Sequence, residues 1–239
     1  MNRIFVCGDT HGVNDLKKLV NLYEKEKLDY SDYIIICGDA GIVWSYDTLE
    51  EDIKLFEDLG ATILFVDGNH ENYDMLNGYK VECWNGGKIH KISERIFHLL
   101  RGQVFNILGK TFLTLGGADS SDKEDRQEYI SWWSDESITY DDAYEAKINL
   151  GKVNNNVDYV ITHTPSTKTL NELVGILTSC GEEIPYFLQK KILPSQSSDM
   201  LDFIHKKVKF KHWFCGHLHI DENVGKVSIL YNDTIIKIN

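Results

Sequence analysis

The chain has 239 residues, of which 42% are hydrophobic and 26% are charged. This composition is typical of soluble globular proteins, and the length suits one large α/β domain over residues 1–239. The formal net charge of -12 argues against a general nucleic-acid binder, because such proteins usually carry a basic surface. No window approaches the roughly 20 apolar residues of a membrane span, and the apolar start is too short for a signal peptide.

Three of the five cysteines, Cys7, Cys37 and Cys215, each follow an apolar run, and none of the five forms a CxxC pair. Free thiols in such places pack as small hydrophobic groups, so we expect them to be buried and reduced. This usage of cysteine predicts a cytoplasmic location.

The first half alternates apolar runs with stretches of helical spacing. The apolar runs at 4–7, 33–37 and 62–66 predict strands that are buried on both faces. Helical spacing separates them at 13–27 and 48–59. This β-α-β-α-β order predicts parallel strands that are joined by right-handed crossovers.

The middle of the chain changes character at residue 88. Four short apolar runs follow one another between residues 88 and 117, with turns that contain glycine. Such close spacing predicts antiparallel hairpins. An acidic and aromatic stretch follows at 120–137, and helical spacing returns at 139–150.

The last third returns to apolar runs around one long helical or irregular region, 166–207, in which Ser198 is the expected N-cap of a helix. The runs, each predicted to be a strand, are 157–162, 211–215, 226–231 and 234–238. The whole pattern predicts an α/β fold in which two mixed β-sheets pack as a sandwich, with helices on the outer faces.

Five polar motifs follow five of these apolar runs. They are Gly8-Asp9-Thr10-His11-Gly12, Gly38-Asp39, Gly68-Asn69-His70-Glu71, Thr162-His163-Thr164 and Gly216-His217-Leu218-His219. Ligands of open α/β sheets bind beyond the carboxyl ends of the strands, so we expect the five loops to converge. The pairs Asp9–His11 and His217–His219 have spacing two, which in extended backbone sends both side chains to the same side.

The residue types in these motifs indicate a divalent transition metal. Carboxylates are hard oxygen donors, whereas imidazole suits Mn, Fe, Ni and Zn. The mixed set suits neither a closed thiolate zinc site nor an all-oxygen calcium site.

The ordered motifs resemble those of the calcineurin-like metallophosphoesterases, which are D-x-H, G-D, G-N-H-D/E, H and G-H-x-H. All five blocks stand in that order between residues 9 and 219. The resemblance implies the α/β/β/α sandwich of that family and two divalent metal ions, with Mn favoured and Fe, Zn or Ni as alternatives.

The resemblance also implies a role for each motif residue. The first metal would be held by Asp9, His11, Asp39 and His219, and the second by Asp39, Asn69, His163 and His217. Asp39 would bridge the two ions, which in such centres lie about 3.5–4 Å apart and acidify a bridging water whose hydroxide attacks phosphorus. His70 would donate a proton to the leaving oxygen or stabilise its charge, since its ordinary pKa lies near working pH.

The second motif departs from the protein phosphatases of this family. There it continues as G-D-x-x-D-R-G, where the later Asp pairs with the motif-three His and the Arg binds phosphate. Here Ile42 and Val43 occupy those positions. The departure lowers the expectation of a protein Ser/Thr phosphatase and slightly favours a phosphodiesterase. Glu71 is one candidate to orient His70 instead.

The middle insert resembles a stretch in a bacterial and phage subgroup of the family, with G-G-A, then Asp, Arg and a Trp pair. Arg126 is the candidate for binding the substrate phosphate, because a guanidinium binds it bidentately. Trp132 and Trp133 are candidates for stacking on a flat group, and Asn69 is a further substrate contact. The alternative is that Asp122 and Arg126 form a surface i,i+4 helix pair and that both tryptophans are core.

Other cations and imidazoles are expected to have structural or surface roles; these are Arg101, His90, His98, His205 and His212. The resulting expectation is a binuclear metal-dependent hydrolase of phosphoester bonds, acting on a phosphorylated small molecule, nucleotide or phosphoprotein. The alternative is an inactive scaffold protein of the same fold. No membrane partner is expected, and the oligomeric state stays open.

Overall fold

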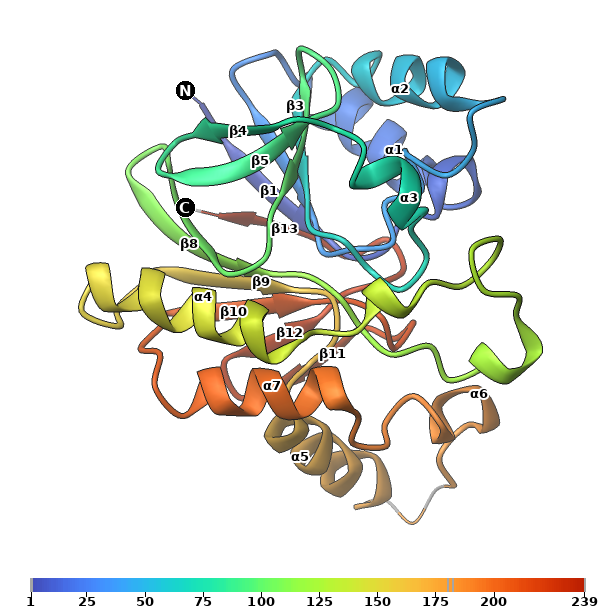
Figure 1. Ribbon diagram of the computed structural model, residues 1–239, viewed down its shortest axis with the longest axis vertical. Helices are drawn as coiled ribbons and strands as arrows, with labels where there is room; N and C mark the ends of the chain where they lie inside the picture. Colours follow the sequence, from blue (N-terminus) through green and yellow to red (C-terminus); the bar gives the residue numbers. More distant parts are fainter. Residues whose placement is uncertain (1, 180, 182, 239) are drawn as a thin grey trace.

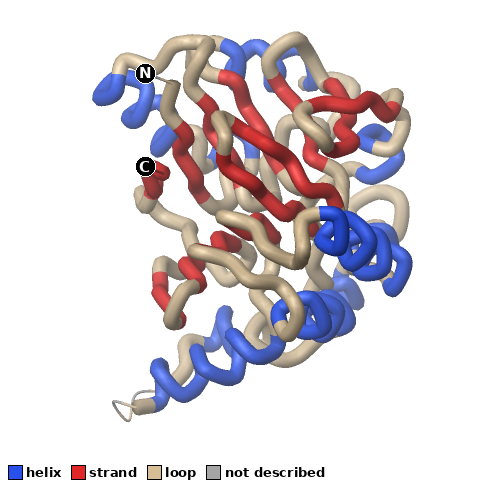
Figure 2. Tube along the Cα trace, turned by 90° about the vertical axis from the view of Figure 1, so that its left-hand side faces the viewer, coloured by secondary structure: helices blue, strands red, loops and turns tan. Residues whose placement is uncertain are grey.

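Two β-sheets pack face to face, and helices cover their outer faces (Figure 1). The computed structural model describes residues 2–179, 181 and 183–238. The view turned by 90° shows the helices lying around the strands (Figure 2). The predicted sandwich of two mixed sheets is therefore confirmed.

The first sheet has seven strands in the order β13-β1-β2-β3-β6-β5-β4. Strands β1, β2, β3 and β6 run parallel to their neighbours in this series, and β13, β5 and β4 add antiparallel edges. The bounds are β1 Ile4–Cys7, β2 Tyr33–Ile36, β3 Thr62–Phe65, β4 Val81–Trp84, β5 Gly87–Lys91, β6 Ile96–Leu99 and β13 Ile235–Ile238.

The second sheet has six strands in the order β11-β12-β10-β9-β8-β7. Strands β8, β9, β10 and β12 are parallel, whereas β7 and β11 pair antiparallel at the edges. The bounds are β7 Gln103–Ile107, β8 Lys110–Leu115, β9 Tyr159–Thr162, β10 His212–Cys215, β11 Glu222–Val224 and β12 Val227–Ile229.

The predicted hairpins of the middle region are confirmed only in part. The pairs β5–β6 and β7–β8 are antiparallel, but they belong to different sheets. On its other side β6 runs parallel to β3, and β8 runs parallel to β9. One chain segment therefore supplies both layers of the sandwich, which local spacing does not reveal.

The helices lie on the outer faces of both sheets (Figure 1). Their bounds are α1 Lys17–Glu26, α2 Leu49–Glu57, α3 Tyr73–Leu76, α4 Tyr140–Lys152, α5 Thr167–Thr178, α6 Tyr186–Gln189 and α7 Gln196–His205, with 3-10 turns at Gly12–Asn14, Lys123–Asp125 and Ser134–Glu136. The first predicted helix began too early, because His11 has a left-handed backbone and a 3-10 turn precedes α1. Ser198 is not an N-cap. Ser195 caps α7, and Ser198 closes the capping box from the third position.

Alternate residues of the central strands pack into two different core layers. In β1, Ile4 and Val6 face the second sheet, whereas Phe5 and Cys7 face α1 and α2. Because both faces are covered, the strand has to be apolar throughout, as its sequence predicted. Cys7, Cys37 and Cys215 are buried and free of disulfides, as expected, while Cys83 is exposed and Cys180 lies outside the described residues.

Within the described ranges, no helix is both long and apolar enough to cross a membrane. The parallel strands of both sheets direct their carboxyl ends to one side of the molecule. The loops after β1, β2, β3, β9 and β10 therefore meet there, and these loops carry the five polar motifs.

Candidate metal centre

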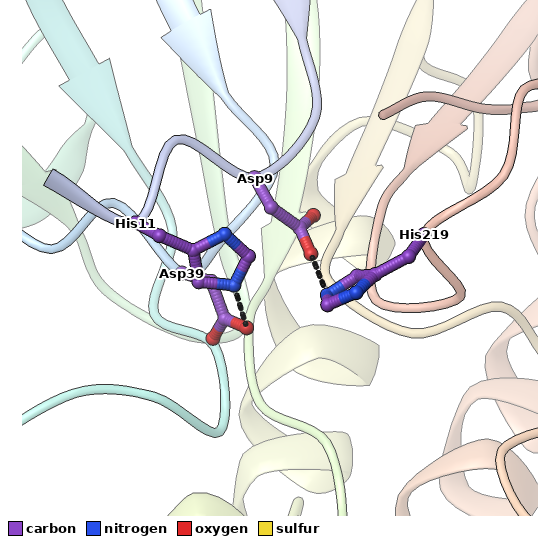
Figure 3. Close-up of side chains that lie close together, drawn as sticks. All are labelled: Asp9, His11, Asp39 and His219. Carbon is purple, nitrogen blue, oxygen red and sulfur yellow. Dashed lines mark ion pairs between the residues drawn. The ribbon is translucent and has the colours of Figure 1, made fainter. Parts of the chain in front are cut away.

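The five motif loops bring carboxylate and imidazole groups together on the side where strands of both sheets end. Figure 3 shows Asp9, His11, Asp39 and His219 pointing toward one another from the loops after β1, β2 and β10. One ligand atom from each of the four lies within 4.8 Å of every other. The predicted convergence of these loops is therefore present in the fold.

Tight left-handed turns position these side chains. The backbone φ angles of His11, Asp39, His217 and His219 are 43°, 49°, 67° and 55°. The extended backbone predicted for the pairs of spacing two is therefore wrong. Residues other than glycine adopt this conformation rarely, and surrounding contacts have to hold it. One such contact is the backbone N–H of His11, which donates to the Asp39 carbonyl at 2.8 Å.

Two glycines allow the carboxylates to lie directly against the backbone of neighbouring loops. A Cβ at Gly68 would stand 2.1 Å from Asp39 Oδ1, and one at Gly216 would stand 2.0 Å from Asp9 Oδ1. No side chain fits at such distances, so glycine is needed for close approach, as the motifs predicted.

We call Asp9, His11, Asp39 and His219 the first ligand group. It contains buried polar atoms that lack a hydrogen-bond partner. Asp39 Oδ2 lies 3.4 Å from His11 Nε2, and Asp9 Oδ2 lies 3.3 Å from His219 Nε2. Both carboxylate oxygens and His219 Nε2 are buried and receive no hydrogen bond. An unpaired buried polar group costs about 1–3 kcal/mol, so three of them facing one point fit a bound cation.

The second ligand group, which we define as Asp39, Asn69, His163 and His217, gathers near the other oxygen of Asp39. His163 Nε2 lies 3.3 Å from Asp39 Oδ1 and 3.2 Å from Asn69 Oδ1. His217 Nδ1 lies 2.8 Å from the same Asn69 oxygen. His163 Nδ1 donates to the carbonyl oxygen of Cys37 at 2.7 Å, which turns Nε2 toward the cluster.

The charges of the cluster favour bound positive charge. Burial disfavours protonation of the His163 imidazole, but Asp39 and Asp9 outweigh burial and raise its pKa to about 9. For His11, Asp39 likewise outweighs burial and raises the pKa to about 9. Burial also disfavours the Asp39 carboxylate, yet His163 and His11 hold its pKa well below the usual range. A divalent cation would satisfy the same carboxylates and release those protons.

Two residues of the middle insert hold the Asn69 side chain in one orientation. Ser120 Oγ donates to Glu136 Oε2 at 2.7 Å, and Asn69 Nδ2 donates to Ser120 Oγ at 3.1 Å. Because the Ser120 hydroxyl hydrogen is committed to Glu136, its oxygen accepts from the amide NH₂. Asn69 Oδ1 therefore faces His163 and His217. Neither Ser120 nor Glu136 was predicted, since neither belongs to a motif.

His70 lies beside the cluster and contacts Arg126. The His70 backbone N–H donates to Asp39 Oδ1 at 2.7 Å. The Arg126 guanidinium lies against the ring, with Nη1 3.1 Å from Nδ1 and Nη2 3.3 Å from Nε2. Burial lowers the pKa of His70; Asp39 opposes that effect and Arg126 adds to it.

Arg126 also forms the ion pair that was predicted as the alternative. Its Nε and Nη2 each donate to the Asp122 carboxylate at 2.8 Å, and Nη1 donates to the Ser131 carbonyl. The pair stands on a 3-10 turn, not on an α-helix. Arg126 therefore links the insert to His70, and its role in phosphate binding stays a prediction.

The two positions at which the protein phosphatases of this family carry Asp and Arg are part of the hydrophobic core here. Ile42 and Val43 are fully buried against the helix-facing side of the first sheet. Glu71 accepts from the Ala40 backbone N–H at 3.0 Å, so its one resolved hydrogen bond supports the loop of Asp39. Burial, with the charge of Asp39, raises the pKa of Glu71 well above its usual range.

The two tryptophans of the insert have different environments. Trp133 is buried, and its Nε1 donates to Asp74 Oδ2 at 2.9 Å. Trp132 is partly buried. The packing alternative therefore describes Trp133, whereas stacking by Trp132 stays a prediction.

The arginine and the histidines that were expected to have structural or surface roles lie outside the metal cluster. Arg101 forms ion pairs with Asp67 at 2.6 Å and with Asp142 at 3.1 Å, and His98 Nε2 also contacts Asp67. His90 contacts His98, while His205 and His212 contact serine side chains. Arg101 is therefore structural, as expected.

A lysine that the sequence did not point to lies near the centre. Lys191 Nζ donates to the His217 carbonyl at 2.7 Å. Burial lowers the pKa of this amine, and the charges of Asp9 and Asp39 oppose that effect. The region 166–207 carries no motif around Lys191, so only the fold brings this cation to the site.

Comparisons with known proteins identify the family of this chain. The family model of the calcineurin-like phosphoesterases matches residues 2–221. Among solved structures, the protein TT1561 of Thermus thermophilus is 13% identical with a TM-score of 0.50, over 100% of this chain and 98% of that chain. The sulfate thiohydrolase SoxB of Thermus thermophilus, in complex with glycerol, is 11% identical with a TM-score of 0.45, over 97% of this chain and 52% of that chain. No curated protein matches.

Likenesses at such low identity show at most the fold, so the family model carries the assignment. It covers most of the chain, and three of that family's motifs supply the cluster of potential metal ligands Asp9, His11, Asp39 and His219. The protein belongs to the calcineurin-like phosphoesterases.

Proposed function

We propose that the protein is a binuclear metal-dependent hydrolase of phosphoester bonds. The observation that carries the proposal is the position of Asp39, whose Oδ2 faces His11 and whose Oδ1 faces His163. One carboxylate thus belongs to two ligand groups. Two divalent ions bound there, with Mn favoured over Fe, Zn or Ni, would bind phosphate oxygens and acidify a water between them.

His70 is our candidate for assisting the leaving group. Its backbone bond to Asp39 ties its position to the proposed bridge. A neutral imidazole accepts at one nitrogen and donates from the other. Arg126 lies within 3.3 Å of both ring nitrogens, so one of them would have to turn from Arg126 to the leaving oxygen when substrate binds. The contact between Arg126 and His70 also supports a substrate role for Arg126, with Asn69 and Trp132 as further candidate contacts.

The second motif bears on the kind of phosphoester that the protein would hydrolyse. Ile42 and Val43 are core residues, which supports a phosphodiesterase or small-molecule phosphatase over a protein Ser/Thr phosphatase. The substrate would be a phosphorylated small molecule, a nucleotide or a phosphoprotein. The buried thiols support a cytoplasmic location.

Metal removal and restoration test the proposal. After chelation, hydrolysis of bis(p-nitrophenyl) phosphate and p-nitrophenyl phosphate should be lost, and added Mn²⁺ should restore it. Asp39→Asn should lower both activity and the number of bound ions, whereas Asp58→Asn, a surface change at the C-cap of α2, should alter neither. Bound metal without turnover on a broad panel of phosphoesters would instead support a scaffold protein.

A further inference from the structure

A pocket opens directly beside His70 and the first ligand group. It has a volume of about 300 Å³ and lies between the Gly12–Asn14 turn and the loop that follows β2. His11 and His70 both line it, with ring centroids 5.8 Å apart. Because His70 is the group proposed to assist the leaving oxygen, the pocket begins where the departing part of a substrate would lie.

Part of the pocket wall is polypeptide backbone from two loops that are in close contact. The Gly12 N–H donates to the Ala40 carbonyl at 3.0 Å, and a Cβ at Gly41 would stand 2.2 Å from the Gly12 nitrogen. The two loops thus touch backbone to backbone, and only glycine fits between them. The pocket is consequently formed before any ligand binds.

Trp44 supplies an aromatic wall that is held from two sides. Its carbonyl accepts from Asn72 Nδ2 at 2.9 Å. Its ring packs edge to face on Trp133, with centroids 5.9 Å apart at 79°. Trp133 is itself buried and bonded to Asp74. A ring held in this way offers a flat surface at little cost in side-chain entropy.

The charge of the pocket disfavours anionic occupants. Asp52 and Thr48 lie in its lining together with Trp44, and none of the described residues that line it is a lysine or arginine. A second phosphate or a carboxylate would meet the Asp52 charge without a compensating cation. An uncharged group that carries hydrogen-bond donors meets no such opposition.

We propose that this pocket, the Trp44 pocket, binds the uncharged aromatic alcohol that leaves from the phosphoester, stacked on the indole ring of Trp44. This inference rests on the proposed function. In the reaction, a water oxygen bonds to phosphorus, the bond between phosphorus and the ester oxygen breaks, and the alcohol leaves with a proton derived from that water. The preferred substrates are therefore aryl or nucleoside phosphoesters without further negative charge.

Two variants and three substrates test the inference. Trp44→Ala should lower kcat/KM for 2-naphthyl phosphate about tenfold, mainly through KM, because stacking is lost. Phenyl phosphate should lose less, and glycerol 2-phosphate should stay within about twofold. Trp44→Phe should retain most of the 2-naphthyl activity. Tyr46→Ala, in the same loop, is the matched control, because Tyr46 is 79% exposed and does not line the pocket.

Bound metal and circular dichroism should be the same in all variants. Equal losses on all three substrates would show that Trp44 only supports the fold, and no loss on any would show that the pocket is unused. Either result overturns the inference. Calorimetric binding of adenosine separates it from the proposed function. Binding that Trp44→Ala abolishes, in a protein that hydrolyses no phosphoester, would refute the proposed hydrolase but keep the pocket. Absence of adenosine binding and of hydrolysis would refute both.

Discussion

Replacing Ser120 by alanine should weaken metal binding at the second ligand group without unfolding the protein. Ser120 Oγ accepts from Asn69 Nδ2 at 3.1 Å, and this bond keeps Asn69 Oδ1 toward His163 and His217. In Ser120→Ala the amide NH₂ loses its partner in a buried place, which costs about 1–3 kcal/mol. Rotation of the amide would relieve that cost but would present NH₂ to the metal.

The expected loss of metal affinity follows from these two responses of the Asn69 amide, an unpaired NH₂ or a rotated amide. A loss of about 1–3 kcal/mol corresponds to roughly 5–150-fold weaker binding of the second ion, which is the usual range for residues that orient a ligand. The first ion should bind nearly as before, because Asp9, His11 and His219 make no resolved contact with Ser120. Isothermal titration of Ser120→Ala with Mn²⁺ should therefore show one tight site and one weakened site.

Two further variants check the reasoning. Ser134→Ala, at an exposed serine of the same insert, should leave both affinities unchanged. Asn69→Asp, added to Ser120→Ala, should restore the second ion, because a carboxylate presents oxygen in either orientation. Wild-type affinity for two ions in Ser120→Ala would refute the orienting role of Ser120.

Three other predictions concern catalysis, acid stability and backbone fit. His70→Ala should lower kcat by about 10²–10⁴ if His70 assists the leaving group, and an unchanged rate would remove that role but leave the metal site. Burial lowers the pKa of His90 to about 4 from its ordinary 6.5, so stability is lost as pH falls from about 6.5 toward 4. Urea unfolding should show that His90 lowers the free energy of unfolding by about 2 kcal/mol between pH 7 and pH 5, and His90→Phe should lack this contribution. An equal loss in the wild type and in His90→Phe would contradict the attribution to His90. Gly68→Ala should abolish metal binding, since its Cβ would overlap the Asp39 carboxylate, whereas Gly175→Ala in α5 meets open space and should raise the free energy of unfolding by about 0.5–1 kcal/mol.

The residues of the candidate centre were predictable because each follows an apolar run. A strand buried on both faces has to be continuously apolar, so β1, β2 and β3 are visible in the sequence as Ile, Val and Leu runs. A polar residue directly after such a run lies at the sheet edge. This local rule located Asp9, Asp39 and His163 without any knowledge of long-range contacts.

Local patterns failed where distant contacts decide the structure. Spacing between residues 88 and 117 indicated hairpins, but only tertiary packing assigns β6 to one sheet and β8 to the other. The extended backbone expected for Asp9–His11 and His217–His219 gave way to left-handed turns, because hydrogen bonds from other loops hold them there. The start of α7 differs for a local reason, because Ser195 and Ser198 form a capping box.

The sequence by itself therefore determined most of the buried strands and the polar groups that follow them. The tertiary structure alone decided how those groups are supported and what lies beside them. Ser120 is 51 residues from Asn69, and Lys191 is 26 residues from His217. Such partners share no period or motif, since their contacts arise only when separate loops meet at one sheet edge. The Trp44 pocket has the same origin, because its walls come from loops that touch only in the folded chain.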